Sequence, residues 1–274
     1  MFIETTRRLL VGTVKAVSMN PVLFVKVCGA WTVLLAVLSI VSGSVTNMSA
    51  GHTTSFQPAD IPYLVGGMIS AASISVAWIR GVLLKTSVSS INLRFQTREA
   101  IFFFWTIIII LILGAFVFLF AILDLILSFF VANLLFFVGS GAFQVFSYVA
   151  VAAIVAFVSF LYAALSLILP AKALDEDLTL KQAFYESRGL RLPMIVSYLV
   201  VGGVLLCVYY LIDFLVPAES ARSVLGAIKT FVLEAVANLG LVLYTGILTG
   251  GYYILRERQM PSGGGPQAPE TPES

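Results

Sequence analysis

Histidine, cysteine and charged residues are scarce in this chain. It contains one histidine and two cysteines, and 11% of its residues are charged, against about 25% in soluble domains. Without histidines, cysteines and carboxylates at ligand spacing, the sequence predicts no metal site, no disulfide framework and no cofactor. A net charge of +2, with dispersed basic residues, predicts no nucleic-acid partner. The common catalytic motifs are also missing, so we expect a protein without catalytic activity.

Long apolar runs are what the chain has in abundance. Hydrophobic residues make up 59% of it and the mean hydropathy is +1.02. The runs are long blocks rather than short alternating segments, as expected of helices that satisfy their own backbone hydrogen bonds in lipid. We therefore expect an all-α fold, a polytopic transmembrane helical bundle of about six spans.

We expect one transmembrane domain over residues 1–258 and a disordered tail over 259–274, which is rich in proline, glycine and serine. The predicted spans are about 21–43, 62–84, 100–123, 143–169, 193–216 and 224–254.

The distribution of basic residues predicts the topology. Apolar sequence from Ile101 to Leu169 is long enough for two spans or three. Basic loops at 85–98 and 171–192 belong on the cytoplasmic side by the positive-inside rule, and only two spans return the chain to that side. We therefore expect a short helix or loop around 125–141 at the outer surface. Both termini are then cytoplasmic.

Two short helices are predicted outside the spans. Residues 1–17 carry an apolar stripe and off-stripe charges, as in a helix that lies on a membrane surface. Asn20-Pro21 then predicts the start of the first span, with Asn20 as the capping residue. In the loop at 171–192, Thr179 and Gln182 resemble a capping box and Gly189 a helix stop, which predicts a short interfacial helix. The acidic residues before it, Asp175 to Asp177, are expected to compensate its dipole.

Ionisable residues near the predicted spans are the candidates for function, because they are costly to place in hydrocarbon. One candidate polar cluster lies near the outer surface and consists of Asp124, Asp213, Lys229 and Glu234. Candidate lipid-headgroup contacts on the cytoplasmic side are Arg7, Arg8, Lys15, Arg80, Lys85, Arg188 and Arg191.

Gly246 and Gly250 form a GxxxG pattern, for which packing within the chain is favoured over dimerisation. Aromatic residues near the span ends, among them Trp78 and Tyr252, are expected to anchor the interface.

Three short motifs carry a resemblance to a known family. They are Ser75-Val-Ala-Trp78-Ile-Arg80-Gly-Val-Leu83, Ser166-Leu-Ile-Leu-Pro170-Ala-Lys-Ala173, and Ala183-Phe184 with Ser187-Arg188-Gly189. In these motifs the chain resembles uncharacterised bacterial inner-membrane proteins related to the membrane domain that precedes some glycerophosphodiester phosphodiesterases. The resemblance implies a six-helix inner-membrane module. Relatives often carry histidine where Ile79 stands, and no segment here matches the phosphodiesterase domain, so the resemblance carries over no activity.

These observations lead to one functional expectation and two alternatives. We expect an accessory or scaffold protein of a bacterial inner membrane that binds membrane lipids, and a protein partner in the membrane, through its helix faces and basic cytoplasmic surface. The first alternative is a small transporter or channel that uses the outer polar cluster. The second is a lipid-modifying enzyme that depends on Asp175 or Asp177.

Overall fold

The computed structural model describes residues 2–42, 58–89, 92–135, 140–216 and 223–259. Within these ranges every regular element is a helix, which confirms the all-α prediction. The elements are α1 (Phe2–Met19), α2 (Pro21–Ser42), the short 3-10 helix η1 (Pro58–Asp60), α4 (Ile61–Leu83), α5 (Thr97–Leu135), α6 (Ser140–Leu165), α7 (Ile168–Ala173), α8 (Leu180–Glu186), α9 (Arg191–Leu215) and α10 (Val224–Gln259). The predicted tail lies outside the described residues apart from Gln259.

Six of these helices are long and apolar enough to cross a membrane. They are Pro21–Ser42, Ile61–Leu83, Thr97–Ile126, Ser147–Ala173, Arg191–Leu215 and Val224–Gln259. The fourth of these segments includes α6 from Ser147 onward and all of α7, with Ser166 and Leu167 between the two helices. The sixth extends beyond the predicted end at residue 254 and includes Arg256 and Arg258 in its last turn.

The boundary between α1 and α2 falls where the sequence predicts it. Pro21 is the first residue of α2, a position where its missing N–H is not needed. Asn20 does not have the predicted capping role at the start of α2. Its side-chain amide instead donates to the carbonyl oxygen of Ala16 at 2.9 Å, so it satisfies the end of α1.

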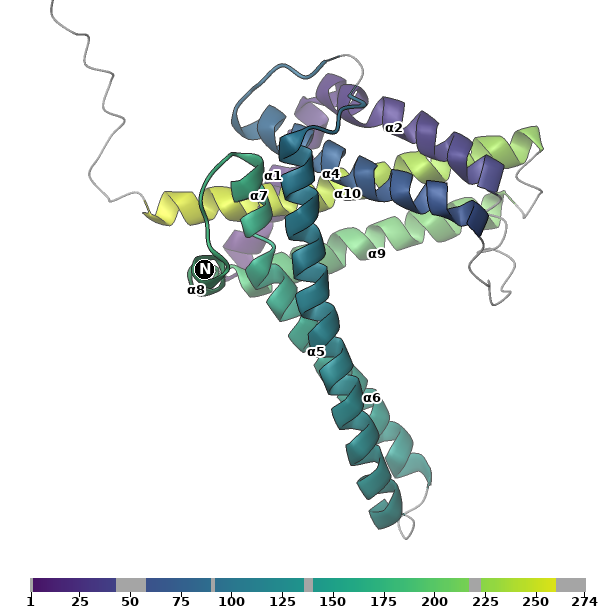
Figure 1. Ribbon diagram of the computed structural model, residues 1–274, viewed down its shortest axis with the longest axis vertical. Helices are drawn as coiled ribbons and strands as arrows, with labels where there is room; N and C mark the ends of the chain where they lie inside the picture. Colours follow the sequence, from purple (N-terminus) through teal and green to yellow (C-terminus); the bar gives the residue numbers. More distant parts are fainter. Residues whose placement is uncertain (1, 43–57, 90–91, 136–139, 217–222, 260–274) are drawn as a thin grey trace, which may run out of the picture.

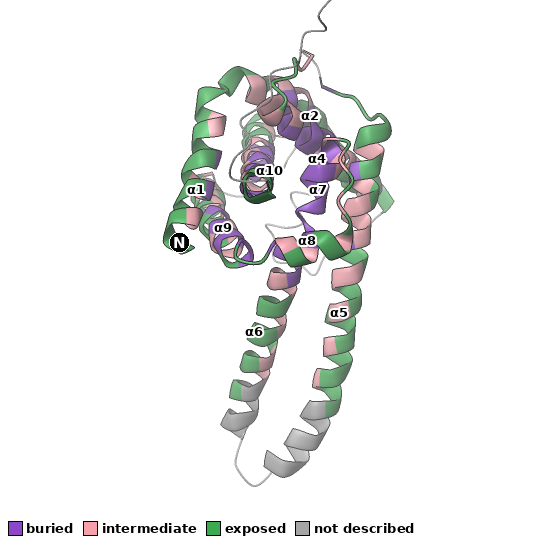
Figure 2. Ribbon diagram, turned by 90° about the vertical axis from the view of Figure 1, so that its left-hand side faces the viewer, coloured by how far each residue is buried: buried purple, intermediate pink, exposed green. Residues whose placement is uncertain are grey.

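Helix α10 forms the centre of the bundle, which we define as α1, α2, α4, α9 and α10. Figure 2 looks along α10 and shows the other bundle helices around it, with buried residues concentrated on the faces toward it. In the most apolar window of α10, 44% of residues are buried inside the protein, against 6% in that of α5. A much larger share of the central helix is therefore buried inside the protein than of α5.

Helices α5 and α6 form an arm that leaves the bundle. In Figure 1 they run side by side, away from α2, α4, α9 and α10. Residues 125–135 continue α5 rather than forming the separate outer segment predicted at 125–141. No proline or glycine follows Gly114 within α5, so nothing in the sequence ends the helix sooner. With 39 residues, α5 is longer than the roughly 20 residues that a span requires.

The two short helices α7 and α8 lie at one end of the bundle, with the C-terminal ends of α4 and α10 (Figure 1). We call this the basic end, because Arg80, Lys172 and Arg256 meet there. The capping box of α8 is confirmed: Thr179 Oγ1 accepts from the backbone N–H of Gln182, and the Gln182 side chain accepts from the backbone N–H of Thr179. Gly189 has a φ of +81°, a left-handed conformation that suits glycine after a helix.

Candidate functional site

The acidic residues that precede α8 join three helices at the basic end. Asp175 lies 3.2 Å from Arg80 of α4 and 2.9 Å from Arg98 of α5. Burial opposes the charged form of Asp175, but the hydrogen bonds and charges of Arg98 and Arg80 outweigh it and lower the pKa of this carboxyl. Glu176 accepts from Tyr252 of α10 and lies 3.0 Å from Arg256. Asp175 and Glu176 therefore connect the loop before α8 to α4, α5 and α10. The sequence had predicted a different role for them, compensation of the dipole of α8.

The lowered pKa of Asp175 makes the stability of the fold depend on pH. A lowered pKa stabilises the fold above the ordinary aspartate pKa, and this contribution is lost as the pH falls through the folded-state pKa. We expect Asp175→Asn to lower the melting temperature by a few degrees at pH 7, about the effect of an exposed ion pair, and to have a smaller effect near pH 3, where more of the carboxyl is protonated. Thermal melts in detergent at both pH values measure this.

Asp177→Asn is the matched control for that substitution. Asp177 also pairs with a cation, Lys172 at 3.1 Å, but its side chain is fully exposed and joins no second helix. We expect its melting temperature to follow the unsubstituted protein at both pH values. An equal loss in both variants at pH 7 would contradict the role given to Asp175.

The predicted headgroup contacts divide into available and occupied residues. Four are exposed and remain candidates, namely Arg7, Lys15, Lys85 and Arg188. Arg8 pairs with Glu257 at 3.3 Å, and Arg80 pairs with Asp175. The prediction is wrong for Arg191, which is buried because its guanidinium lies between the rings of Phe160 and Phe184, 4.5 and 4.1 Å from their centroids. Its N–H groups donate to the Phe184 carbonyl oxygen and, at 2.9 Å, to Ser187 Oγ.

The predicted outer polar cluster is present only in part. Lys229 Nζ donates to Asp213 Oδ1 at 2.7 Å and to the Val216 carbonyl oxygen at 2.8 Å. Glu234, one turn further along α10, accepts from Tyr63 of α4 at 2.8 Å. Asp124 does not join these pairs. It lies on the α5–α6 arm, in an apolar pocket formed by α5 and α6, because the arm diverges from the bundle.

A buried polar seam along α10 was not predicted. Asn238 donates to Thr32 of α2 at 2.9 Å, and Thr245 lies 3.1 Å from Ser75 of α4, hydroxyl to hydroxyl. Such hydrogen bonds cross-link helices where lipid offers no alternative partner. One sequence pattern could have predicted this seam. Thr230, Glu234 and Asn238 follow one another at intervals of four residues, which places them on one face of the helix.

The GxxxG glycines lie where α1 crosses α10. A Cβ on Gly246 would lie 2.6 Å from Cγ2 of Thr13, and one on Gly250 would lie 3.1 Å from Cδ2 of Leu9. Leu9 and Thr13 are the buried residues of α1. The glycines thus let α1 approach α10 closely, and their contacts are within the chain.

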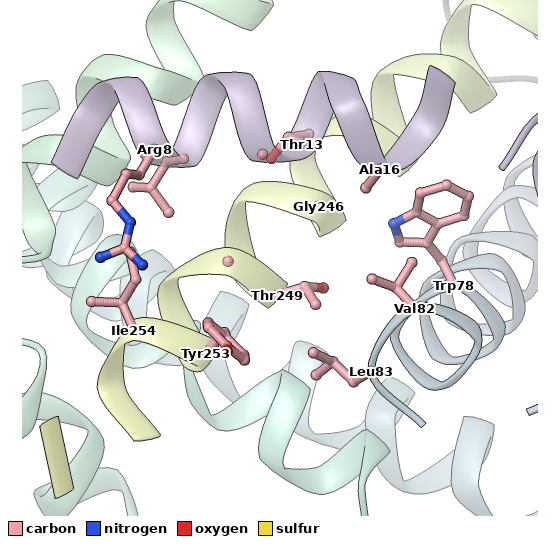
Figure 3. Close-up of a pocket in the computed structure, with 13 residues that line it drawn as sticks. Arg8, Thr13, Ala16, Trp78, Val82, Leu83, Gly246, Thr249, Tyr253 and Ile254 are labelled. Carbon is pink, nitrogen blue, oxygen red and sulfur yellow. The ribbon is translucent and has the colours of Figure 1, made fainter. Parts of the chain in front are cut away.

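A pocket of about 320 Å³ lies beside this crossing, between α1, α4 and α10 (Figure 3). Trp78 is fully buried in the wall of this pocket, which corrects its predicted role as an interface anchor. Tyr252, predicted to have the same role, is also buried, since it bonds Glu176 inside the basic end. Arg8 and Tyr253 line the opposite side of the pocket from Trp78.

A larger groove of about 770 Å³ lies where the arm meets the bundle. It is lined by α5, α6, α9 and α10, and tyrosines form much of its wall: Tyr198 lies between Tyr162 and Tyr244, with ring centroids 5.9 and 5.6 Å apart. The backbone of α9 opens the groove at Gly202 and Gly203. A Cβ on Gly202 would lie 2.7 Å from Tyr244 Oη, whereas one on Gly203 would meet nothing within 4 Å. We name this space the tyrosine groove.

The structure brings together no candidate metal-binding cluster among the residues that it describes. No group of three or more histidines, cysteines or carboxylates lies close enough to hold a metal ion within these ranges. The carboxylates of the loop before α8 are occupied by cations or a tyrosine hydroxyl, as described above.

Six apolar helices of spanning length define the class of the protein, a multi-pass α-helical membrane protein. No protein-family model, curated protein or solved structure matches the chain. The resemblance to membrane domains associated with phosphodiesterases therefore stays a prediction.

Proposed function

We propose that the protein is a non-enzymatic accessory protein of a bacterial inner membrane that binds phospholipid, with an acyl chain in the tyrosine groove. The observation that carries the proposal is the groove itself. It lies between helices that are long and apolar enough to span a membrane, and Leu199, Leu206 and Gly203 line its wall. Because these helices are surrounded by hydrocarbon in a bilayer, an acyl chain is the most abundant apolar group that reaches the groove.

The size of the groove favours a lipid chain over a partner helix. Small-molecule pockets have volumes of about 300–1,000 Å³, and the value of 770 Å³ falls in this range. A membrane-spanning helix about 10 Å across and 30 Å long occupies roughly 2,400 Å³. A whole helix would therefore not fit within the groove and would pack across its opening instead.

Charge at the basic end supports an anionic lipid. Ile195 lines the groove, and Arg188 precedes it by seven residues in the chain, exposed and stacked on Tyr185. We infer that this end faces the cytoplasm, with both termini on that side, because basic loops are retained there. Each exposed cation near an anionic membrane surface contributes about 1 kcal/mol of attraction.

Gly203→Phe tests this proposal. Gly203 lines the groove and a Cβ there would meet nothing within 4 Å, and phenylalanine has a higher helix propensity than glycine. We expect the variant to fold and to lose at least about tenfold of the phospholipid that remains bound after delipidation, since the ring occupies the space of the chain. Native mass spectrometry of the purified protein measures the bound lipid.

Gly114→Phe is the matched control. Gly114 also lies in a membrane-spanning helix with nothing within 4 Å of its Cβ position, but it does not line the groove. We expect this variant to retain lipid like the unsubstituted protein. Equal retention in Gly203→Phe and Gly114→Phe would exclude the groove as the lipid site, and a stoichiometric protein bound to the unsubstituted chain would favour a scaffold for a protein partner.

The transporter alternative stays a prediction. It requires the outer polar residues to act together, but the structure separates them into the Lys229–Asp213 pair, the Glu234–Tyr63 pair and the distant Asp124.

A further inference from the structure

Two residues that line the pocket between α1, α4 and α10 each carry a buried polar atom without a hydrogen-bond partner among the described residues. Nε1 of Trp78 and Oγ1 of Thr13 are buried, and neither makes a hydrogen bond within the described part of the chain. Figure 3 shows the indole nitrogen of Trp78 turned toward the interior of the pocket. A buried donor without a partner costs about 1–3 kcal/mol of stability. Buried donors without a hydrogen-bond acceptor are therefore rare in native proteins. These two atoms indicate that the pocket holds a molecule that accepts hydrogen bonds.

The lining of the pocket restricts the chemistry of that molecule. The indole N–H can only donate, and the threonine hydroxyl is free to donate as well. Leu9, Val82 and Ile254 give the pocket apolar walls. Arg8, the charged residue among those that line it, already pairs with Glu257, so the pocket does not call for an anion.

We propose that this pocket binds an uncharged carbonyl group on an apolar skeleton, with Trp78 Nε1–H and Thr13 Oγ1–H as donors. This site is distinct from the tyrosine groove, since different faces of α10 line the two. Two membrane molecules share the chemistry: the acyl esters of glycerolipids and the ring carbonyls of isoprenoid quinones. Gly12 of α1 lines the pocket, and a Cβ there would meet nothing within 4 Å, so this glycine leaves space for the skeleton.

The indole N–H of Trp78 reports directly on its partner. The chain has three tryptophans, and Trp31 Nε1 already donates to Ser73, so it serves as an internal reference. Protein with ¹⁵N-labelled indoles is placed in nanodiscs of ester-linked lipid, of ether-linked lipid, and of ether-linked lipid with a decyl-tailed benzoquinone. Trp78→Phe assigns the Trp78 signal by its loss.

We expect the Trp78 indole proton to lie downfield in at least one carbonyl-containing nanodisc and to move upfield in ether lipid alone. A downfield signal in ester lipid identifies the lipid ester, and one restored by the benzoquinone identifies the quinone. Thr13→Val should weaken the response about fivefold in carbonyl concentration, the usual effect of losing one hydrogen bond. An identical Trp78 signal in all nanodiscs would mean that water alone fills the pocket and would overturn the proposal. This outcome is independent of lipid retention in Gly203→Phe.

Discussion

Leucine in place of Gly246 is expected to displace α1 from the bundle. A Cβ there would lie 2.6 Å from Thr13 Cγ2, closer than side chains approach, and leucine adds three further carbons. Overpacking of this kind costs about 1–3 kcal/mol, and α1 can avoid it by moving away. Tryptic cleavage at Arg7 and Arg8 should then become at least about tenfold faster, since the α1 contacts that protect them are lost.

Gly67→Leu provides the control for that experiment. Gly67 lies within α4, and a Cβ there would meet nothing within 4 Å. We expect its cleavage at Arg7 and Arg8 to match that of the unsubstituted protein. If Gly246→Leu were cleaved no faster than Gly67→Leu, the packing of α1 on the GxxxG face would be refuted.

Loss of Arg191 is expected to cost about 3 kcal/mol of stability. Hydrogen bonds to a charged group contribute about 1.5–3 kcal/mol, and a desolvated cation over an aromatic ring about 2 kcal/mol, although such terms are not additive. Arg191→Leu removes both kinds of contact and leaves the Phe184 carbonyl without this donor. Because Arg191 of α9 joins α8 to Phe160 of α6, we expect the basic end to loosen first.

Thermal melts in detergent measure the effect, with Arg188→Leu as the control. Arg188 is exposed and stacks only on neighbouring Tyr185, so its loss should change stability by less than about 0.5 kcal/mol. Arg191→Lys should recover only part of the lost stability. The ammonium group of lysine is not planar, so it cannot stack on aromatic rings and donate several hydrogen bonds at the same time as a guanidinium does. Equal stability of Arg191→Leu and Arg188→Leu would contradict the structural role of Arg191.

Local signals in the sequence predicted local structure well. Pro21 begins α2, Thr179 and Gln182 form the capping box of α8, and Gly189 has the left-handed conformation expected after a helix. Each depends on residues at most a few positions apart. Hydropathy likewise predicted an all-α fold with six apolar helices, because the requirement for span length acts on each segment separately.

Contacts between residues that are far apart in the chain could not be predicted from the sequence. Arg191 looked like a headgroup contact, because charge and position near a span end say nothing about the rings of Phe160 and Phe184 on either side. Asp124 was grouped with Asp213 on the assumption that all spans pack together. The direction of the α5–α6 arm breaks that assumption, and apolarity on every side of α5 gives no information on which face meets the bundle.

The tyrosine groove could be predicted only in fragments. Gly202 and Gly203 show in the sequence that two neighbouring positions of α9 lack side chains. The tyrosines around them, however, come from α6, α9 and α10, which are far apart in the chain. The buried atoms of Trp78 and Thr13 were equally hidden, since an aromatic residue near a span end usually anchors the interface.

A structure of the intact protein in nanodiscs of native lipid tests the central proposal most directly. The account predicts the arm turned away from the bundle and elongated, unbranched density in the tyrosine groove, in contact with Tyr162, Tyr198 and Gly203, continuing to a headgroup near Arg188. Helix α6 packed along the length of α9, with the groove closed and no lipid between them, would contradict it.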